Sequence, residues 1–81
     1  MKTNYIVKVK ETEIYSSYNQ EEAENVFCKK IEELSNNYKT YDELENEPND
    51  DQEASALYCS LIAAYEDGEE EILDESESFY M

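Results

Sequence analysis

The side chains of this chain that could take part in the most kinds of chemistry are carboxylates, since Asp and Glu make up 22 of its 81 residues. Paired carboxylates can act as general acid and base in glycoside hydrolysis, but that chemistry needs a cleft that holds the sugar between them. A chain this short has little room for such a cleft. It also contains no His, no Arg and a single Gly, which excludes the common basic catalysts and a phosphate-binding loop. We therefore predict that the protein is not an enzyme.

Metal binding is the second chemistry that clustered acids suggest. The runs Asp50 to Glu53 and Asp67 to Glu71 each place several oxygen ligands close together. Neither has the ligand order or the glutamate at position 12 of an EF-hand loop. Cys28 and Cys59 lack any histidine partner and are interpreted as free thiols buried on helices, with a disulfide left open. We predict no dedicated metal site and no cofactor.

Charge is divided unevenly between the two halves of the chain. Residues 1–39 hold all 6 lysines against 7 acids, a net charge of −1, while residues 40–81 hold 15 acids and no base. The total is −16. Such a field repels nucleic acid and attracts basic surfaces. We expect a basic DNA-binding protein as partner, no direct contact with nucleic acid, and a monomer or small homo-oligomer.

Length and composition favour one small folded domain over residues 1–81. Leu, Ile, Val and Phe number 15, a low share that with high net charge is typical of disorder. Eight tyrosines and regular apolar spacing favour folding instead. The start, Met1 to Asn4, leads into an alternating pattern rather than an apolar block, and no stretch is apolar enough to span a membrane. We expect a cytoplasmic protein without membrane contact.

Residues 1–39 are predicted to form the scaffold that positions the acids. From Tyr5 to Tyr18, apolar and polar residues alternate, which indicates a β-hairpin. Asn19 and Glu22 form a capping box, and the segment Gln20 to Ser35 then carries apolar residues three and four apart. This spacing predicts an amphipathic helix that lies against the hairpin.

Residues 40–81 are predicted to form an acidic helical segment. Thr40 to Leu44 should make a short helical turn, and Asp50 to Tyr65 a long helix capped by Asp50 with an apolar stripe. Glu71 to Asp74 suits a third strand beside the hairpin, followed by a tail, Glu75 to Met81. The fold class is therefore α+β: an N-terminal β-hairpin, with a possible third C-terminal strand, packed against two or three helices.

The ends of the predicted Asp50 to Tyr65 helix differ in what they gain from negative charge. Carboxylates at its start interact favourably with the helix dipole and stabilise the helix. Each acid of Glu66 to Glu71 at its end interacts unfavourably with the dipole and destabilises the helix by ~0.3 to 1 kcal/mol. At ~1.5 Å per residue the two ends would stand roughly 24 Å apart. Acids that lower the stability of the fold indicate a surface that binds a positively charged partner. The alternative is a solvated surface that binds nothing.

The predicted partner-binding residues combine these acids with tyrosines that can exclude water inside a charged field. They are Asp42, Glu43, Glu45, Glu47, Asp50, Asp51, Glu66, Asp67, Glu69, Glu70, Glu71, Tyr41, Tyr65 and Tyr80. Tyr65 would also complete the apolar stripe of the predicted helix, so a core position is the alternative for that residue.

The chain resembles the phage-encoded DNA-mimic inhibitors, small acidic α+β proteins that include anti-CRISPR, anti-restriction and uracil-DNA glycosylase inhibitor proteins. The resemblance lies in size, in the charge of −16, and in the acid-and-tyrosine runs Tyr41 to Glu47 and Tyr65 to Glu71. It implies a non-enzymatic inhibitor that occupies the DNA-binding site of a host defence protein, first a CRISPR effector and next a restriction enzyme. The alternative is an acidic interaction module, such as an adaptor, antitoxin or regulatory subunit, whose basic partner binds it outside any DNA site.

Overall fold

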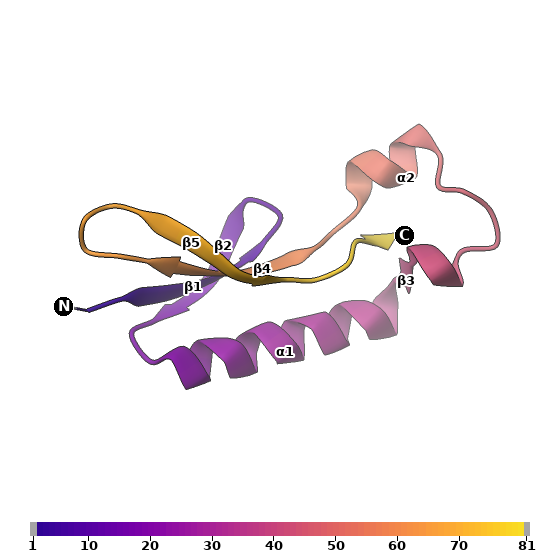
Figure 1. Ribbon diagram of the computed structural model, residues 1–81. Coiled ribbons are helices and arrows are strands. Elements are labelled where there is room, and N and C mark those ends of the chain that lie inside the picture. The colour runs from indigo at the N-terminus through magenta and orange to yellow at the C-terminus, as the bar shows by residue number, and fades with distance from the viewer. Residues whose placement is uncertain (1, 81) are drawn as a thin grey trace.

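The computed structural model describes residues 2–80 as a four-stranded antiparallel sheet with one long helix, α1 (Gln20–Asn37), on one face (Figure 1). The strands of this sheet are β1 (Asn4–Val9), β2 (Thr12–Ser17), β4 (Cys59–Ala64) and β5 (Glu70–Glu75). Their order is β2-β1-β4-β5, so β2 and β5 are the edges. The predicted α+β class is confirmed, as are the N-terminal hairpin and the amphipathic helix that follows it.

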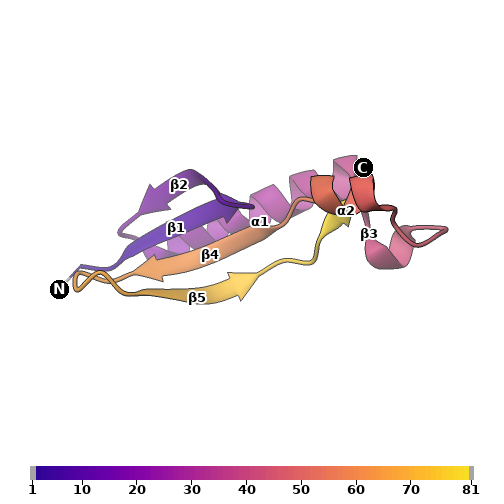
Figure 2. The same cartoon turned by 90° about the horizontal axis from the view of Figure 1, so that it is seen from above.

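A smaller part of the chain lies beyond the C-terminal end of α1. There β3 (Lys39–Thr40) pairs with β6 (Phe79–Tyr80), and between them in sequence come the 3-10 helix η1 (Tyr41–Glu43) and the short helix α2 (Asp50–Ser55). Figures 1 and 2 show this part at one end of the molecule and the β4–β5 turn at the other. The result is an elongated shape of 47 × 21 × 16 Å.

The core lies between α1 and the sheet. Side chains of β1 and β4 alternate between the two faces, so Val7 and its cross-strand partner Leu61 both point toward α1. They meet Phe27 and Leu34 of the helix in one buried cluster. The side chain of Asn19 caps α1 by accepting a hydrogen bond of 3.2 Å from the backbone N–H of Glu22. Local capping and the apolar stripe of α1 therefore agree with the packing.

The predicted helix from Asp50 to Tyr65 is wrong in its larger part. Helix α2 ends at Ser55, and its N-cap is Asn49 rather than Asp50. Residues Cys59–Ala64 instead form β4, a central strand whose first five residues are buried. A strand buried on both faces has no alternation of apolar and polar residues, so its pattern resembles that of a buried helix. Residues 40–81 are thus mainly strands and loops, not a helical segment.

The C-terminal residues also pair differently from expectation. The predicted C-terminal strand is confirmed as β5, but it pairs with β4, which lies between it and the hairpin. In the predicted tail, Phe79 is buried and belongs to β6, while Met81 lies outside the described residues. Of the two thiols, both predicted to be buried on helices, Cys28 on α1 is exposed and Cys59 is buried on β4, where burial raises the pKa of its thiol.

Candidate functional site

The predicted acidic residues form two separate surfaces at opposite ends of the molecule (Figures 1 and 2). The hairpin acidic surface, at the β4–β5 turn, consists of Glu66, Asp67, Glu69, Glu70 and Glu71. The loop acidic surface, around η1 and the start of α2, consists of Asp42, Glu43, Glu45, Glu47, Asp50 and Asp51. The two surfaces do not cap one helix, so the helical rise on which the predicted spacing of roughly 24 Å was based does not apply to them. The cost to a helix dipole is likewise absent at the hairpin surface, because a strand precedes it.

A tight turn fixes the hairpin acidic surface. Gly68 has a φ of +91°, a conformation that glycine adopts without strain. Its N–H donates to the carbonyl of Tyr65 at 3.0 Å, and the N–H of Tyr65 donates to the carbonyl of Glu69 at 2.8 Å. The carboxylate of Asp67 accepts from the N–H of Glu69 at 3.0 Å. These bonds set the direction in which the turn carboxylates leave the backbone.

Tyr65 is half-buried and is tied to the hairpin acidic surface rather than to the stripe of a helix. Its hydroxyl donates to Glu71 Oε2 at 2.7 Å. This hydrogen bond to a carboxylate is the main cause that raises the pKa of Tyr65 above its ordinary value, with desolvation as the next cause. At the tip of the surface, Glu66 Oε1 accepts from the backbone N–H of Lys2 at 2.8 Å. Two of the five carboxylates therefore hold defined orientations through distant residues.

The loop acidic surface is organised by local caps. Glu43 Oε1 accepts from the backbone N–H of Thr40 at 3.1 Å and from its hydroxyl at 2.9 Å. These bonds hold the pKa of Glu43 below its ordinary value, and the bond from the backbone N–H is the larger cause. The side chain of Asn49 caps α2 by accepting from the N–H of Gln52 at 2.8 Å, which leaves Asp50 exposed in the first turn. Glu43 thus caps η1 through Thr40, whereas the other acids of this surface are not part of that cap.

The three predicted tyrosines divide between the two ends. Tyr41 and Tyr80 lie edge to face at the loop end, with ring centroids 6.4 Å apart and an interplanar angle of 64°. Tyr41 is 53% exposed, so this pair presents aromatic surface to solvent. Tyr65 lies at the hairpin end. Each acidic surface therefore has an aromatic side chain beside it, as the sequence predicts, although the partners of these rings were not predictable.

The sequence prediction omitted the acids that continue the hairpin acidic surface along β5. Asp74 and Glu75 lie on this edge strand, all six residues of which are exposed, and Glu77 follows it. The sequence of β5 is Glu-Glu-Ile-Leu-Asp-Glu, and its four acids could have indicated from the sequence that the surface continues along this strand. Among residues 2–80 the structure contains one salt bridge, between Lys30 and Glu33 on α1. The acids of the hairpin surface and of β5 therefore face solvent without a paired lysine in the described chain.

No protein-family model, curated protein or solved structure matches this chain. In the part of the chain that the structure describes, no group of three or more His, Cys, Asp or Glu residues is arranged to hold a metal ion. None of the helices between residues 2 and 80 combines the length and the apolar character that crossing a membrane requires.

Proposed function

We propose that this protein is a non-enzymatic DNA mimic that blocks the DNA-binding site of a host defence protein, first a CRISPR effector and next a restriction enzyme. The observation that carries the proposal is the line of exposed carboxylates that begins at the β4–β5 turn and continues along the free edge strand β5. These acids lack salt bridges within residues 2–80, so their field remains available to a basic partner.

The spacing of this line supports mimicry of one DNA strand. An antiparallel strand rises ~3.4 Å per residue, and each strand of B-DNA carries one phosphate per ~3.4 Å of helix axis. Within the nine residues 69–77, six are acidic: Glu69, Glu70, Glu71, Asp74, Glu75 and Glu77. Six charges over nine residues at ~3.4 Å each give about one charge per 5 Å, of the same order as one DNA strand, although successive side chains point to opposite faces.

The shape of the molecule supports the same proposal. Its long axis of 47 Å corresponds to about 14 base-pair steps at ~3.4 Å per step. The loop acidic surface then supplies a second contact at the far end, and the exposed ring of Tyr41, packed against the half-buried Tyr80, supplies aromatic surface beside it. A basic groove long enough for duplex DNA can contact both ends at once.

The proposal is tested by DNA cleavage assays with purified CRISPR effector–guide RNA complexes and with restriction enzymes. We expect inhibition of one of these enzymes by the wild type and loss of inhibition in the triple variant E69K/E70K/E71K. The matched control is E11K/E21K/E32K, which changes the net charge from −16 to −10 in the same way but on the opposite half of the chain. Equal inhibition by both variants would overturn the proposal. If the inhibited enzyme holds DNA and this protein together, the acidic interaction module is the correct function.

A further inference from the structure

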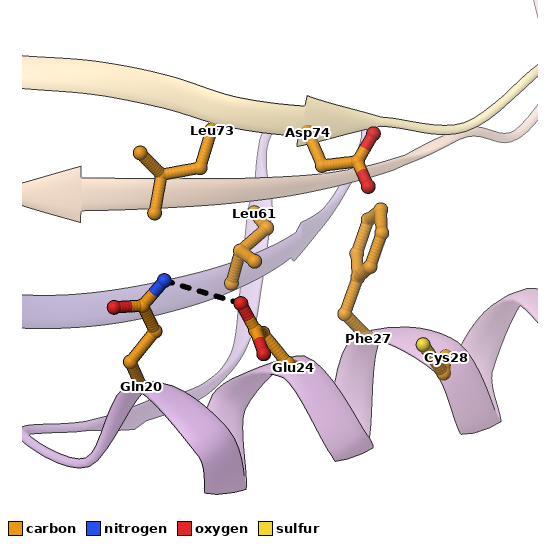
Figure 3. Close-up of a pocket in the computed structure, with 7 residues that line it drawn as sticks. All are labelled: Gln20, Glu24, Phe27, Cys28, Leu61, Leu73 and Asp74. Carbon is orange, nitrogen blue, oxygen red and sulfur yellow. Dashed lines mark hydrogen bonds between the residues drawn. The ribbon is translucent and has the colours of Figure 1, made fainter.

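A groove lies between α1 and the edge strand β5, on the helix-covered side of the sheet (Figure 3). It exists because one helix is too narrow for four strands. A helix is about 10–12 Å wide, whereas the axes of four strands at ~4.8 Å spacing span roughly 14 Å. Helix α1 packs against β1, β2 and β4, so β5 extends past it. The groove has a volume of about 390 Å³.

A β-bulge directs two consecutive side chains of β5 into this groove. Ile72 lies opposite Ile62, but Asp74, not Leu73, lies opposite Leu61, so Leu73 is the extra residue. In a regular strand Leu73 and Asp74 would point to opposite faces of the sheet. Figure 3 shows both side chains on the side that faces α1. The irregular pairing therefore combines an apolar wall and a carboxylate at one place.

The lining of the groove is apolar at the base and acidic above it. Phe27 and Leu61 form the base and are 4% and 2% exposed, and Leu73 adds an apolar wall that is 38% exposed. Glu24 from α1 and Asp74 from β5 supply carboxylates on the two sides (Figure 3). This combination suits a ligand with an apolar stem and a cationic head.

The two carboxylates are oriented but retain capacity for a cation. Glu24 Oε1 accepts from the Gln20 side-chain amide at 3.1 Å, and Asp74 Oδ1 accepts from the N–H of Glu75 at 2.9 Å. An ionised carboxylate has about four lone-pair sites, so one such bond leaves most of them open. Neither carboxylate forms a salt bridge within residues 2–80.

We propose that this groove binds the side chain of one arginine of the basic partner, an inference that rests on the proposed function. The methylene groups of the arginine pack on Phe27 and Leu73, and its guanidinium group lies between Glu24 and Asp74. Arginine suits the groove better than lysine, because its planar, weakly hydrated head can donate hydrogen bonds to two carboxylates and stack near an aromatic ring. The bound arginine is then a buried anchor inside a charged field, which electrostatic attraction alone does not provide.

The test uses the isolated protein and N-acetyl-L-arginine methylamide as the probe, followed by 1H–15N NMR titration. We expect saturable shifts at the amides of Glu24, Phe27, Leu73 and Asp74, with a millimolar dissociation constant that suits a single side chain. The citrulline analogue has nearly the same shape without the charge and should not produce these shifts. The variant E24Q/D74N should weaken binding roughly 10-fold or more, since it removes charge-assisted hydrogen bonds.

The matched control is E21Q/E32Q, which removes two charges from exposed positions of α1 that do not line the groove. This control should bind the arginine probe like the wild type. Shifts spread over both acidic surfaces, equal shifts with the citrulline analogue, or unchanged binding in E24Q/D74N would overturn the inference. The NMR titration uses the isolated protein without a partner, so a failure to bind the arginine probe does not change the outcome expected in the cleavage assays. Conversely, failed inhibition with a groove that binds arginine would contradict the proposed function alone.

Discussion

The two acidic surfaces carry similar charge but are built in different ways. The hairpin acidic surface lies on β4 and β5, two strands of the main sheet, and a glycine turn with several backbone bonds fixes its direction. The loop acidic surface lies on η1, α2 and the irregular residues between them, joined to the body through the two-residue pair of β3 and β6. Similar charge in the sequence thus produces one surface held by the main sheet and one that depends on a small anchor.

The anchor of the loop acidic surface is centred on Phe79. This residue is 3% exposed and belongs to the main core cluster. Its N–H donates to the carbonyl of Leu57 at 2.7 Å, and the N–H of Leu57 donates back to its carbonyl at 2.9 Å. Lys39 and Thr40 pair with the same strand from the other side. Phe79 is therefore the most buried side chain that ties the loop end to the core, and the hydrogen bond of 2.8 Å from Lys10 Nζ to the carbonyl of Ala54 adds a second tie.

The largest effect is expected from Phe79→Ala. Loss of a buried phenylalanine ring should lower the free energy of unfolding by about 3–5 kcal/mol, as measured by urea denaturation. Hydrogen exchange should accelerate more at Leu57 than at Leu61, because only the former is paired with β6. The control is Leu73→Ala, a partly exposed site on the edge strand β5. Equal acceleration at both amides would show that the two ends are not separately anchored.

A smaller loss is expected from Gly68→Ala, which tests the rigid turn of the hairpin acidic surface. No atom lies within 4 Å of the added Cβ, so the cost is that of a positive φ in a residue other than glycine. We predict a decrease of about 1–2 kcal/mol in the free energy of unfolding. NMR shifts should change at Tyr65 and Glu69 and not around α2. A neutral effect on stability would mean that the turn does not fix this surface.

Neutralising the acids should stabilise the protein slightly, and more at the hairpin acidic surface than at the loop acidic surface. We expect the triple variant E69Q/E70Q/E71Q to gain roughly 0.5 kcal/mol at low salt, since like charges held near one another on strands are destabilising. The matched variant E45Q/E47Q/D50N, on the loop acidic surface, should gain less. The difference should vanish at about 1 M salt, where the Debye length is near 3 Å. A larger gain for the loop variant would reverse the comparison.

The smallest effects concern proton binding, and they have opposite signs at the two ends. The lowered pKa of Glu43 contributes stability that is present above its unfolded value near 4.5 and is lost as pH falls through the folded value. The raised pKa of Tyr65 contributes stability that is present below its unfolded value near 10 and is lost as pH rises through the folded value. NMR titration should show both shifts, with Thr40→Val and Glu71→Gln moving each pKa back toward its ordinary value. Thr40→Val keeps the backbone bond from residue 40, so the pKa of Glu43 should return only in part. Unchanged pKa values would exclude the Thr40 hydroxyl bond and the Tyr65–Glu71 bond as contributors.

Local patterns in the sequence predicted the parts of the fold that local patterns control. The alternation in β1 and β2 and the capped apolar stripe of α1 were sufficient for both elements. Strand β4 was missed because it is buried on both faces and forms through pairing with β1, from Val9↔Cys59 to Asn4↔Ala64, which no local spacing reveals. The acids and tyrosines of the site could be selected from composition, but their separation into two ends depends on β4. The groove was not predictable, since it needs β5 beside β4 and its lining depends on the bulge at Leu73.

Competition with DNA for one target is the most direct test of DNA mimicry. The enzyme inhibited in the cleavage assays would be loaded with fluorescent duplex, and the anisotropy followed as this protein is added. We predict complete displacement of the duplex at about 0.05 M salt and an apparent affinity of this protein at least roughly 10-fold weaker at 0.2 M. The variant E69K/E70K/E71K should not displace the duplex. A stable complex that contains target, duplex and this protein together, or displacement that is insensitive to salt, would contradict mimicry.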